Sequence, residues 1–207
     1  MLMPNWFIAG GLVMYPLLLF SILAVALILE RILFWGKVSQ RHQRVAREVL
    51  SVYKRNQIAA FQMLEKNADL PIARIFLAAL ELEQATPEEF RLALESAGLA
   101  EIPLLKRFNT VFDTIVGLSP LLGLLGTITG LINSFASLRL GDVGGTNTLG
   151  VTGGISEALI STASGLVVAI FTLLFANLFR GLYARQIALI QEYGGQLELL
   201  YRRRHTF

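Results

Sequence analysis

The chain has no cysteine among its 207 residues, so it contains no disulfide, no thiolate zinc site and no cysteine nucleophile. It has only two histidines, His42 and His205, and neither has a second histidine or a carboxylate at ligand spacing. We therefore expect both to be solvated surface residues rather than metal ligands. Charged residues make up only 16% of the chain against 54% hydrophobic residues. With a mean hydropathy of +0.59, this composition is typical of an integral membrane protein and not of a soluble domain.

Three long runs lack any charged residue: Phe7–Leu29 with 23 residues, Thr114–Leu138 with 25 and Ala158–Phe179 with 22. At 1.5 Å of rise per residue even the shortest covers about 33 Å, which is enough to cross a bilayer. Pro16 is expected to bend the first run, because its ring removes one helical hydrogen bond. The pattern after Phe179 stays helical to about Tyr201. The sequence thus predicts an all-α membrane protein with three transmembrane helices.

The net charge of +3 comes from an uneven distribution of Lys and Arg along the chain. None lies in residues 1–30, twelve lie in 31–107, one lies at Arg139 and five lie in 180–207. By the positive-inside rule the N-terminus is outside and the two basic regions are cytoplasmic, so the charge needs no nucleic-acid partner. Residues 202–204, all Arg, are expected to be the solvated end of a cytoplasmic helix, with anionic membrane lipid as the alternative ligand.

The expected organisation is therefore a chain that crosses the membrane three times and carries a helical domain between its first two spans. Its parts are a periplasmic N-terminus (1–10), a first transmembrane helix (11–34), a cytoplasmic helical domain (35–113), a second transmembrane helix (114–138), a periplasmic loop (139–152), a third transmembrane helix (153–179) and a cytoplasmic helical tail (180–207).

Two helix starts are predicted inside the cytoplasmic domain. Thr86, Pro87 and Glu89 form a capping box, and Asp69 is expected to cap a helix from Pro71 to about Gln84. No catalytic constellation occurs in this domain, so we expect no enzyme activity. Four leucines are expected to pack in its interior: Leu92, Leu99, Leu104 and Leu105.

Glu157 is the leading functional candidate, because it is a single carboxylate directly before an uncharged run. An acid facing lipid would cost a few kcal/mol, so it must turn inward, pair or carry a proton. The alternative is that Glu157 only caps the third helix at the outer interface. On a helical wheel one face of this span is small or polar (Gly150, Gly153, Gly154, Glu157, Ser161, Ser164 and Gly165), and the other is apolar (Leu159, Ala163, Leu166, Ile170 and Leu173).

The second span carries a comparable stripe of small and hydroxyl residues: Gly123, Thr127, Gly130, Ser134 and Ser137. Within the same span, Gly126 and Gly130 have the four-residue spacing of close helix packing. A phosphate loop is excluded, since no Lys-Ser/Thr pair follows these glycines and no strand precedes them. The hydroxyls can support a hydrated proton path, although Ser161 and Ser164 can equally bond their own backbone.

The order and spacing of three segments resemble the ExbB/TolQ/MotA family of proton-channel subunits. These segments are GLVMYPLLLFSILAVALILER (11–31), PLLGLLGTITGLINSF (120–135) and ISEALISTASGLVVAI (155–170). The resemblance is to ExbB and TolQ more than to MotA, which has four spans. It implies a homo-oligomer, a pentamer in that family, around helices of an ExbD- or TolR-like partner, and a TonB- or TolA-like protein that is energised by proton flow.

The resemblance also implies site roles: Glu157, Thr162 and Thr127 line the channel, and Ser161, Ser164 and Ser134 are further channel-lining candidates. Phe171 departs from the family, which commonly has Pro there, so a straighter third span is expected. No cofactor or metal is implied.

The expected function is a proton-channel or stator subunit of an inner-membrane complex that drives outer-membrane transport. A TolQ-like role in envelope integrity and a non-conducting membrane scaffold are the alternatives, although a scaffold has no need for Glu157. A secondary transporter would have more spans and an internal repeat.

Overall fold

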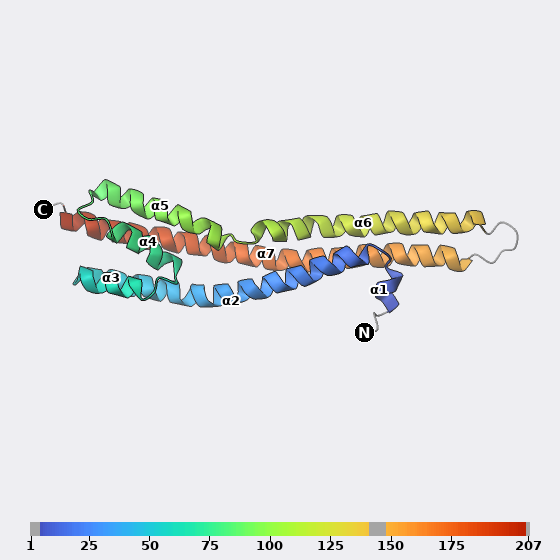
Figure 1. Ribbon diagram of the computed structural model, residues 1–207, viewed down its shortest axis with the longest axis horizontal. Coiled ribbons are helices and arrows are strands. Elements are labelled where there is room, and N and C mark those ends of the chain that lie inside the picture. The colour runs from blue at the N-terminus through green and yellow to red at the C-terminus, as the bar shows by residue number, and fades with distance from the viewer. Residues whose placement is uncertain (1–4, 141–147, 206–207) are drawn as a thin grey trace. The chain divides into compact units, whose positions relative to one another are not determined.

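The computed structural model describes residues 5–140 and 148–205, which fold into helices with no strand among them (Figure 1). The predicted all-α class is confirmed. The helices are α1 (Asn5–Ala9), α2 (Met14–Tyr53), α3 (Gln57–Glu65), α4 (Pro71–Leu80), α5 (Pro87–Leu105), α6 (Asn109–Leu140) and α7 (Thr148–His205).

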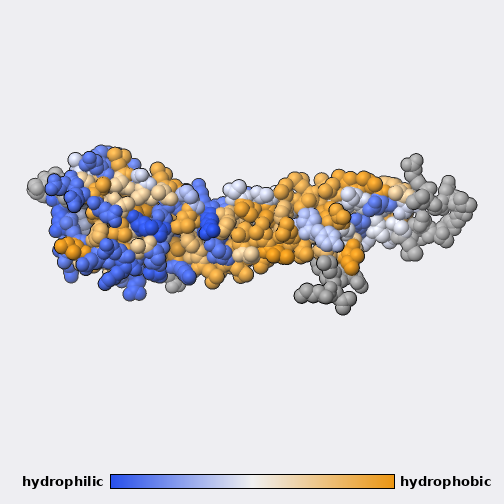
Figure 2. Space-filling model, viewed as in Figure 1, coloured by the Kyte–Doolittle hydropathy of each residue, from blue (hydrophilic) through white to orange (hydrophobic). Residues whose placement is uncertain are grey.

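The chain divides into two compact units. We call residues 1–29 with 108–178 the apolar unit, and residues 30–107 with 179–207 the polar unit. Helices α2 and α7 contribute residues to both units, whereas α6 lies entirely in the apolar unit. Three helical stretches, containing α2, α6 and α7, are long and apolar enough to cross a membrane, as predicted. Figure 2 shows hydrophobic surface over α6 and mostly hydrophilic surface around α3 and α5.

The first predicted span is interrupted near its start. Helix α1 ends at Ala9, and α2 begins only at Met14, after Gly11 has taken a φ of 74°. Pro16 is consequently the third residue of α2, where a backbone N–H has no acceptor within the helix. It removes no interior hydrogen bond, and the predicted bend at Pro16 is wrong.

Helices α6 and α7 run antiparallel with closely packed backbones. A Cβ built on Gly130 would lie 2.6 Å from the Gly154 carbonyl oxygen and 2.9 Å from the Ala158 nitrogen. A Cβ on Gly126 would collide with the Ser161 side chain. The predicted close packing through Gly126 and Gly130 is confirmed. All of the predicted loop 139–152 lies either outside the described residues (141–147) or inside helices, since α6 continues to Leu140 and α7 begins at Thr148.

In the polar unit the predicted capping box is present. Thr86 Oγ1 accepts from the Glu89 N–H at 3.3 Å, and Glu89 Oε2 accepts from the Thr86 N–H at 2.7 Å. Tyr201 stacks on Phe90 in α5 with ring centroids 4.0 Å apart and donates to the Ala85 carbonyl at 2.6 Å. These contacts attach the far end of α7 to the start of α5, and the predicted helical continuation to Tyr201 is confirmed.

The predicted cap by Asp69 is wrong. The N-cap of α4 is Leu70, which makes no side-chain cap, and α4 ends at Leu80 rather than near Gln84. Asp69 Oδ2 instead accepts from Arg41 Nη1 at 2.6 Å, because a guanidinium on α2 offers a charged partner that the helix start does not. Gln84 has a φ of 51°, which ends any helical continuation.

The prediction of a solvated His42 is also wrong. His42 is fully buried, its Nδ1 lies 2.9 Å from Gln186 Oε1, and its Nε2 accepts from the Ile72 N–H at 3.4 Å. An acceptor role for Nε2 places the proton on Nδ1, which donates to Gln186. The side chain of His205 lies outside the described part of the chain.

Arg31 is a buried cation that organises the end of α5. Its Nη2 donates to the carbonyl oxygens of Leu104 at 3.2 Å and Arg107 at 2.5 Å, at and just beyond the C-terminus of α5. Its guanidinium lies over the Phe34 ring at 4.9 Å, and its Nε is 3.6 Å from Glu30 Oε2. In the sequence Arg31 is only the last residue of the segment 11–31, and no local pattern predicts these partners.

Candidate functional site

The candidate site lies in the apolar unit, where α6 faces α7. The hydroxyls of Thr127 and Thr162 are hydrogen-bonded to each other, and either can be the donor. Thr162 Oγ1 lies 3.0 Å from the Gly123 carbonyl oxygen, and Thr127 Oγ1 lies 3.4 Å from the carbonyl oxygen of Ala158. Gly123 permits this approach, because a Cβ there would sit 3.0 Å from the Thr162 Cα. The structure thus brings together two of the three residues that the sequence placed in one channel.

Glu157 lies in α7, five residues before Thr162, and contacts a different part of the chain. It is half-buried, and its carboxyl group lies against Gly11, in the turn between α1 and α2. Within the described residues no hydrogen bond joins it to Thr127 or Thr162 and no Lys or Arg forms an ion pair with it. Along α7 the five residues from Glu157 to Thr162 correspond to about 7.5 Å of rise, so a proton passing between them would need intervening water.

The alternative that Glu157 merely caps α7 is wrong. The helix begins at Thr148, so Glu157 is its tenth residue and lies well beyond the first turn, where the unpaired N–H groups are found. Sequence reading could not find this, because the glycines and threonines of 148–153 resemble a loop.

The three serines predicted to line the channel differ in their hydrogen-bond partners and burial. Ser161 is fully buried and donates to the Ala158 carbonyl of its own helix at 3.0 Å, which is the plain interpretation left open from the sequence. Ser134 is also buried and lies 3.0 Å from the Gly130 carbonyl and 3.1 Å from that of Val151 in α7, so it links the two helices. Ser164 is half-buried.

The two predicted faces of the third span are largely confirmed. Leu159 and Ile170 are exposed by 67% and 66%, whereas Gly154 and Gly165 are buried against α6. Gly153 is the exception, since nothing lies within 4 Å of a Cβ built on it. Helix α7 runs without interruption through Phe171, as the absence of proline predicted.

Sequence reading missed Ser119 as part of this packing. Its side chain is fully buried and donates to the Ile115 carbonyl at 2.7 Å, and its own carbonyl meets Gly165 of α7. The missed signal is spacing, because Ser119 precedes Gly123 by four residues on the stripe already assigned to the second span.

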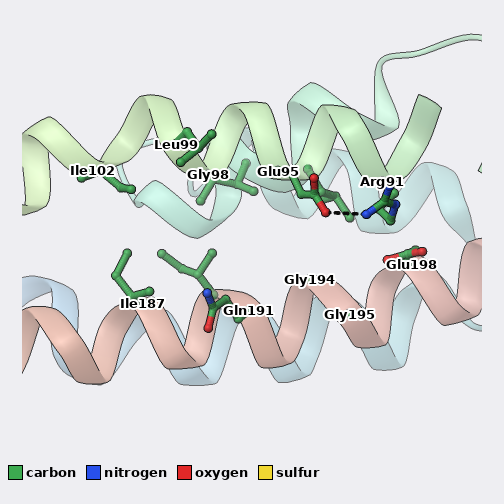
Figure 3. Close-up of a pocket in the computed structure, with 13 residues that line it drawn as sticks. Arg91, Glu95, Gly98, Leu99, Ile102, Ile187, Gln191, Gly194, Gly195 and Glu198 are labelled. Atoms are coloured by element: carbon green, nitrogen blue, oxygen red, sulfur yellow. Dashed lines mark hydrogen bonds and ion pairs between the residues drawn. The ribbon is translucent and has the colours of Figure 1, made fainter. Parts of the chain in front are cut away.

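The polar unit holds a groove of about 490 Å³ between α5 and α7 (Figure 3). Its walls include Leu99 and Ile102 from α5 and Ile187 from α7, and Arg91 is paired with Glu95 at 2.9 Å at one end. Leu92 and Leu99 are exposed by 53% and 66%, and Leu104 by 37%, so the prediction that they pack in the interior is wrong. Only Leu105 of that group is buried. Of the three exposed leucines, Leu99 lines the groove.

No group of three or more His, Asp or Glu side chains within residues 5–140 and 148–205 is placed to hold a metal ion. The groups present at Glu157, Thr127 and Thr162 are a carboxyl group, which can bind and release a proton, and hydroxyls and backbone carbonyls, which can bind water.

The fold and these groups define a multi-pass α-helical membrane protein with an acid and a hydroxyl pair between its spanning helices. The sequence profile of the MotA/TolQ/ExbB proton channel family matches residues 67–192. The chain belongs to this family.

Named relatives are consistent with this assignment. A Synechocystis sp. protein called "Putative biopolymer transport protein ExbB-like 3" is 64% identical over 197 residues, covering 95% of this chain and 94% of its own. A second from that organism, "Putative biopolymer transport protein ExbB-like 1", is 41% identical over 197 residues, covering 95% of this chain and 78% of its own. The "Biopolymer transport protein ExbB" of Salmonella typhimurium is 43% identical over 81 residues, which is 39% of this chain and 31% of that protein.

Proposed function

We propose that this chain is the proton-conducting stator subunit of an inner-membrane complex that couples proton-motive force to a partner acting in outer-membrane transport. The observation that carries the proposal is Glu157, a half-buried carboxyl in an apolar spanning helix with no cation paired to it in the described chain. One charge crossing 100 mV releases about 2.3 kcal/mol, and an acid that exchanges a proton inside the membrane can use it.

The Thr127–Thr162 pair supplies hydroxyls for the same path. A hydroxyl both donates and accepts, so two bonded hydroxyls beside backbone carbonyls can order water on the way to Glu157. In this proposal Glu157 takes up and releases the proton, and Thr127 and Thr162 position the water. Ser134, Ser161 and Ser164 are proposed as additional residues that line the same proton path.

The assembly proposed is a homo-oligomer, by the family resemblance a pentamer, that encloses spanning helices of an ExbD- or TolR-like partner and energises a TonB- or TolA-like protein. The N-terminus is periplasmic and the C-terminal tail cytoplasmic, following the Lys and Arg distribution. The names of the relatives, which contain ExbB and biopolymer transport, favour an ExbB-like role over a TolQ-like one.

The test is proton flux into vesicles that contain the subunit and its partner, under an imposed pH gradient and potential. Glu157→Gln keeps the shape and hydrogen-bonding capacity of the side chain but cannot exchange a proton, so we expect flux to be abolished with assembly intact. Glu83→Gln, at an exposed position in the polar unit, is the matched control and should conduct like the parent. Parental flux in Glu157→Gln would favour a scaffold or an acid supplied by the partner.

A further inference from the structure

The carboxyl group of Glu157 fits against a glycine that has no room for a side chain. A Cβ built on Gly11 would fall on Oε1 of Glu157, 2.6 Å from its carboxyl carbon and 3.0 Å from its Cγ. The contact therefore involves three atoms at the end of the Glu157 side chain and not a single atom.

Two properties of the turn require glycine at position 11. Its φ of 74° lies in the left-handed region, which most residues avoid, and the space beside it is occupied by Glu157. The Gly11 N–H donates to the Ile8 carbonyl, and the Met14 N–H donates to the Gly11 carbonyl at 3.2 Å, so the turn is closed on both sides.

The turn is held against α7 by packing on either side of the contact. A Cβ on Gly10 would lie 3.0 Å from Cγ2 of Ile160, one turn of α7 beyond Glu157. Phe7, Val13, Met14 and Leu17 form a buried cluster around it, with Ile160 and Leu122 packed on that cluster. Packing thus holds the turn at Gly11 in a fixed position beside the Glu157 carboxyl group.

Within the described residues no Lys or Arg forms an ion pair with Glu157. The surface that the Glu157 carboxyl group contacts is the Gly11 backbone, which has dipoles but no full charge. The carboxyl group is thus held in position by packing and not by an ion pair.

We propose that Gly11 is a positioning residue for Glu157: the turn between α1 and α2 seats the carboxyl where it takes up and releases its proton, and any side chain at position 11 displaces it. The proposal rests on the proposed function of Glu157 as the proton-exchanging acid. It adds that the segment before α2 controls the placement of that acid.

The first test compares two glycine-to-alanine changes. Gly11→Ala should lower proton flux about tenfold or more, since misplacing a reacting group by about 1 Å has effects of up to a hundredfold. Gly153→Ala, four residues before Glu157 and with open space around its Cβ, should conduct like the parent. Equal flux in the two variants overturns the proposal.

The second test separates contact from backbone strain. Gly11→Asn adds a Cβ but tolerates a left-handed φ, so it should behave like Gly11→Ala. Parental flux in Gly11→Asn would show that strain alone is responsible and would overturn the proposal. Glu157→Asp withdraws the carboxyl by one methylene, so adding Gly11→Ala to it should reduce flux further by less than twofold.

A chemical readout keeps the proposal independent of conduction. A water-soluble carbodiimide with a small amine should label residue 157 faster in Gly11→Ala than in the parent, as measured by mass spectrometry, because the carboxyl is displaced from its seat. Gly153→Ala should label like the parent. If Glu157→Gln conducts normally, the proposed function fails, while the labelling comparison still decides whether Gly11 seats Glu157; unchanged labelling in Gly11→Ala overturns that seat.

Discussion

Nδ1 of His42 in α2 lies 2.9 Å from Oε1 of Gln186 in α7, 144 positions later in the chain. Both side chains are buried, and the Ile72 N–H at the start of α4 donates to the other ring nitrogen. One neutral imidazole therefore joins three helices of the polar unit. The arrangement leads to a prediction about pH.

Acid should destabilise the polar unit through His42. Burial lowers the pKa of His42 from 6.5 to about 4, although the hydrogen bond that His42 donates to Gln186 raises it; Arg74, Glu101 and Asp69 are the nearby charges. Because the unfolded chain then takes up the proton first, stability is fully present above pH 6.5 and is lost as the pH falls towards 4. The loss is on the order of 3 kcal/mol.

The measurement is the apparent unfolding midpoint of the detergent-solubilised protein between pH 7 and about pH 4, compared with His42→Gln. The variant is expected to be less stable at pH 7 but to lose less stability on acidification. An identical pH dependence in both proteins would contradict the role of His42.

Gly130 should be intolerant of a methyl group. Its Cβ would meet the backbone of Gly154 and Ala158, which cannot rotate away, so Gly130→Ala should separate α6 from α7 and destabilise the protein by about 1–3 kcal/mol. Gly117→Ala in the same helix is the control, because nothing lies within 4 Å of its Cβ. That change should be neutral or stabilising by up to about 1 kcal/mol. Thermal unfolding in detergent distinguishes the two, and equal midpoints would contradict the packing.

Thr127→Val and Thr162→Val should each lower proton flux less than Glu157→Gln does, because water can bridge one missing hydroxyl. Since the two hydroxyls are bonded to each other, the double variant should lose less than the sum of the two single losses in free energy. Thr129→Val is the matched control, because Thr129 donates only within α6, to the Gly126 carbonyl at 3.0 Å. Simple additivity in vesicle flux would show that the pair does not act as a unit.

The orientation in the membrane can be tested with single cysteines, since the chain has none of its own. We expect an impermeant thiol reagent added outside to label a cysteine at position 145, in the connection between the second and third spans. Cysteines at Gln62 and Gln196, which are exposed in the polar unit, should react only after the membrane is opened. Labelling of position 62 from outside would reverse the proposed topology.

Local patterns were read correctly where their causes are local. The capping box at Thr86 and Glu89 lies within four residues, and the contrast between Leu159 and Gly154 follows from helical period alone. Asp69 was misread because a capping residue and an ion-pair partner have the same chemistry, and the Arg41 that decides between them is 28 positions away.

The sequence by itself determined the class of protein, the three spanning helices and the stripes of small and hydroxyl residues along two of them. Apolar run length and helical period fix these features, and both are properties of neighbouring residues. Only the tertiary structure decided that Thr127 meets Thr162, that His42 is buried and that Glu157 lies against Gly11. Each of these contacts joins residues 30 or more positions apart, and packing of whole helices, not any local pattern, selects the partner.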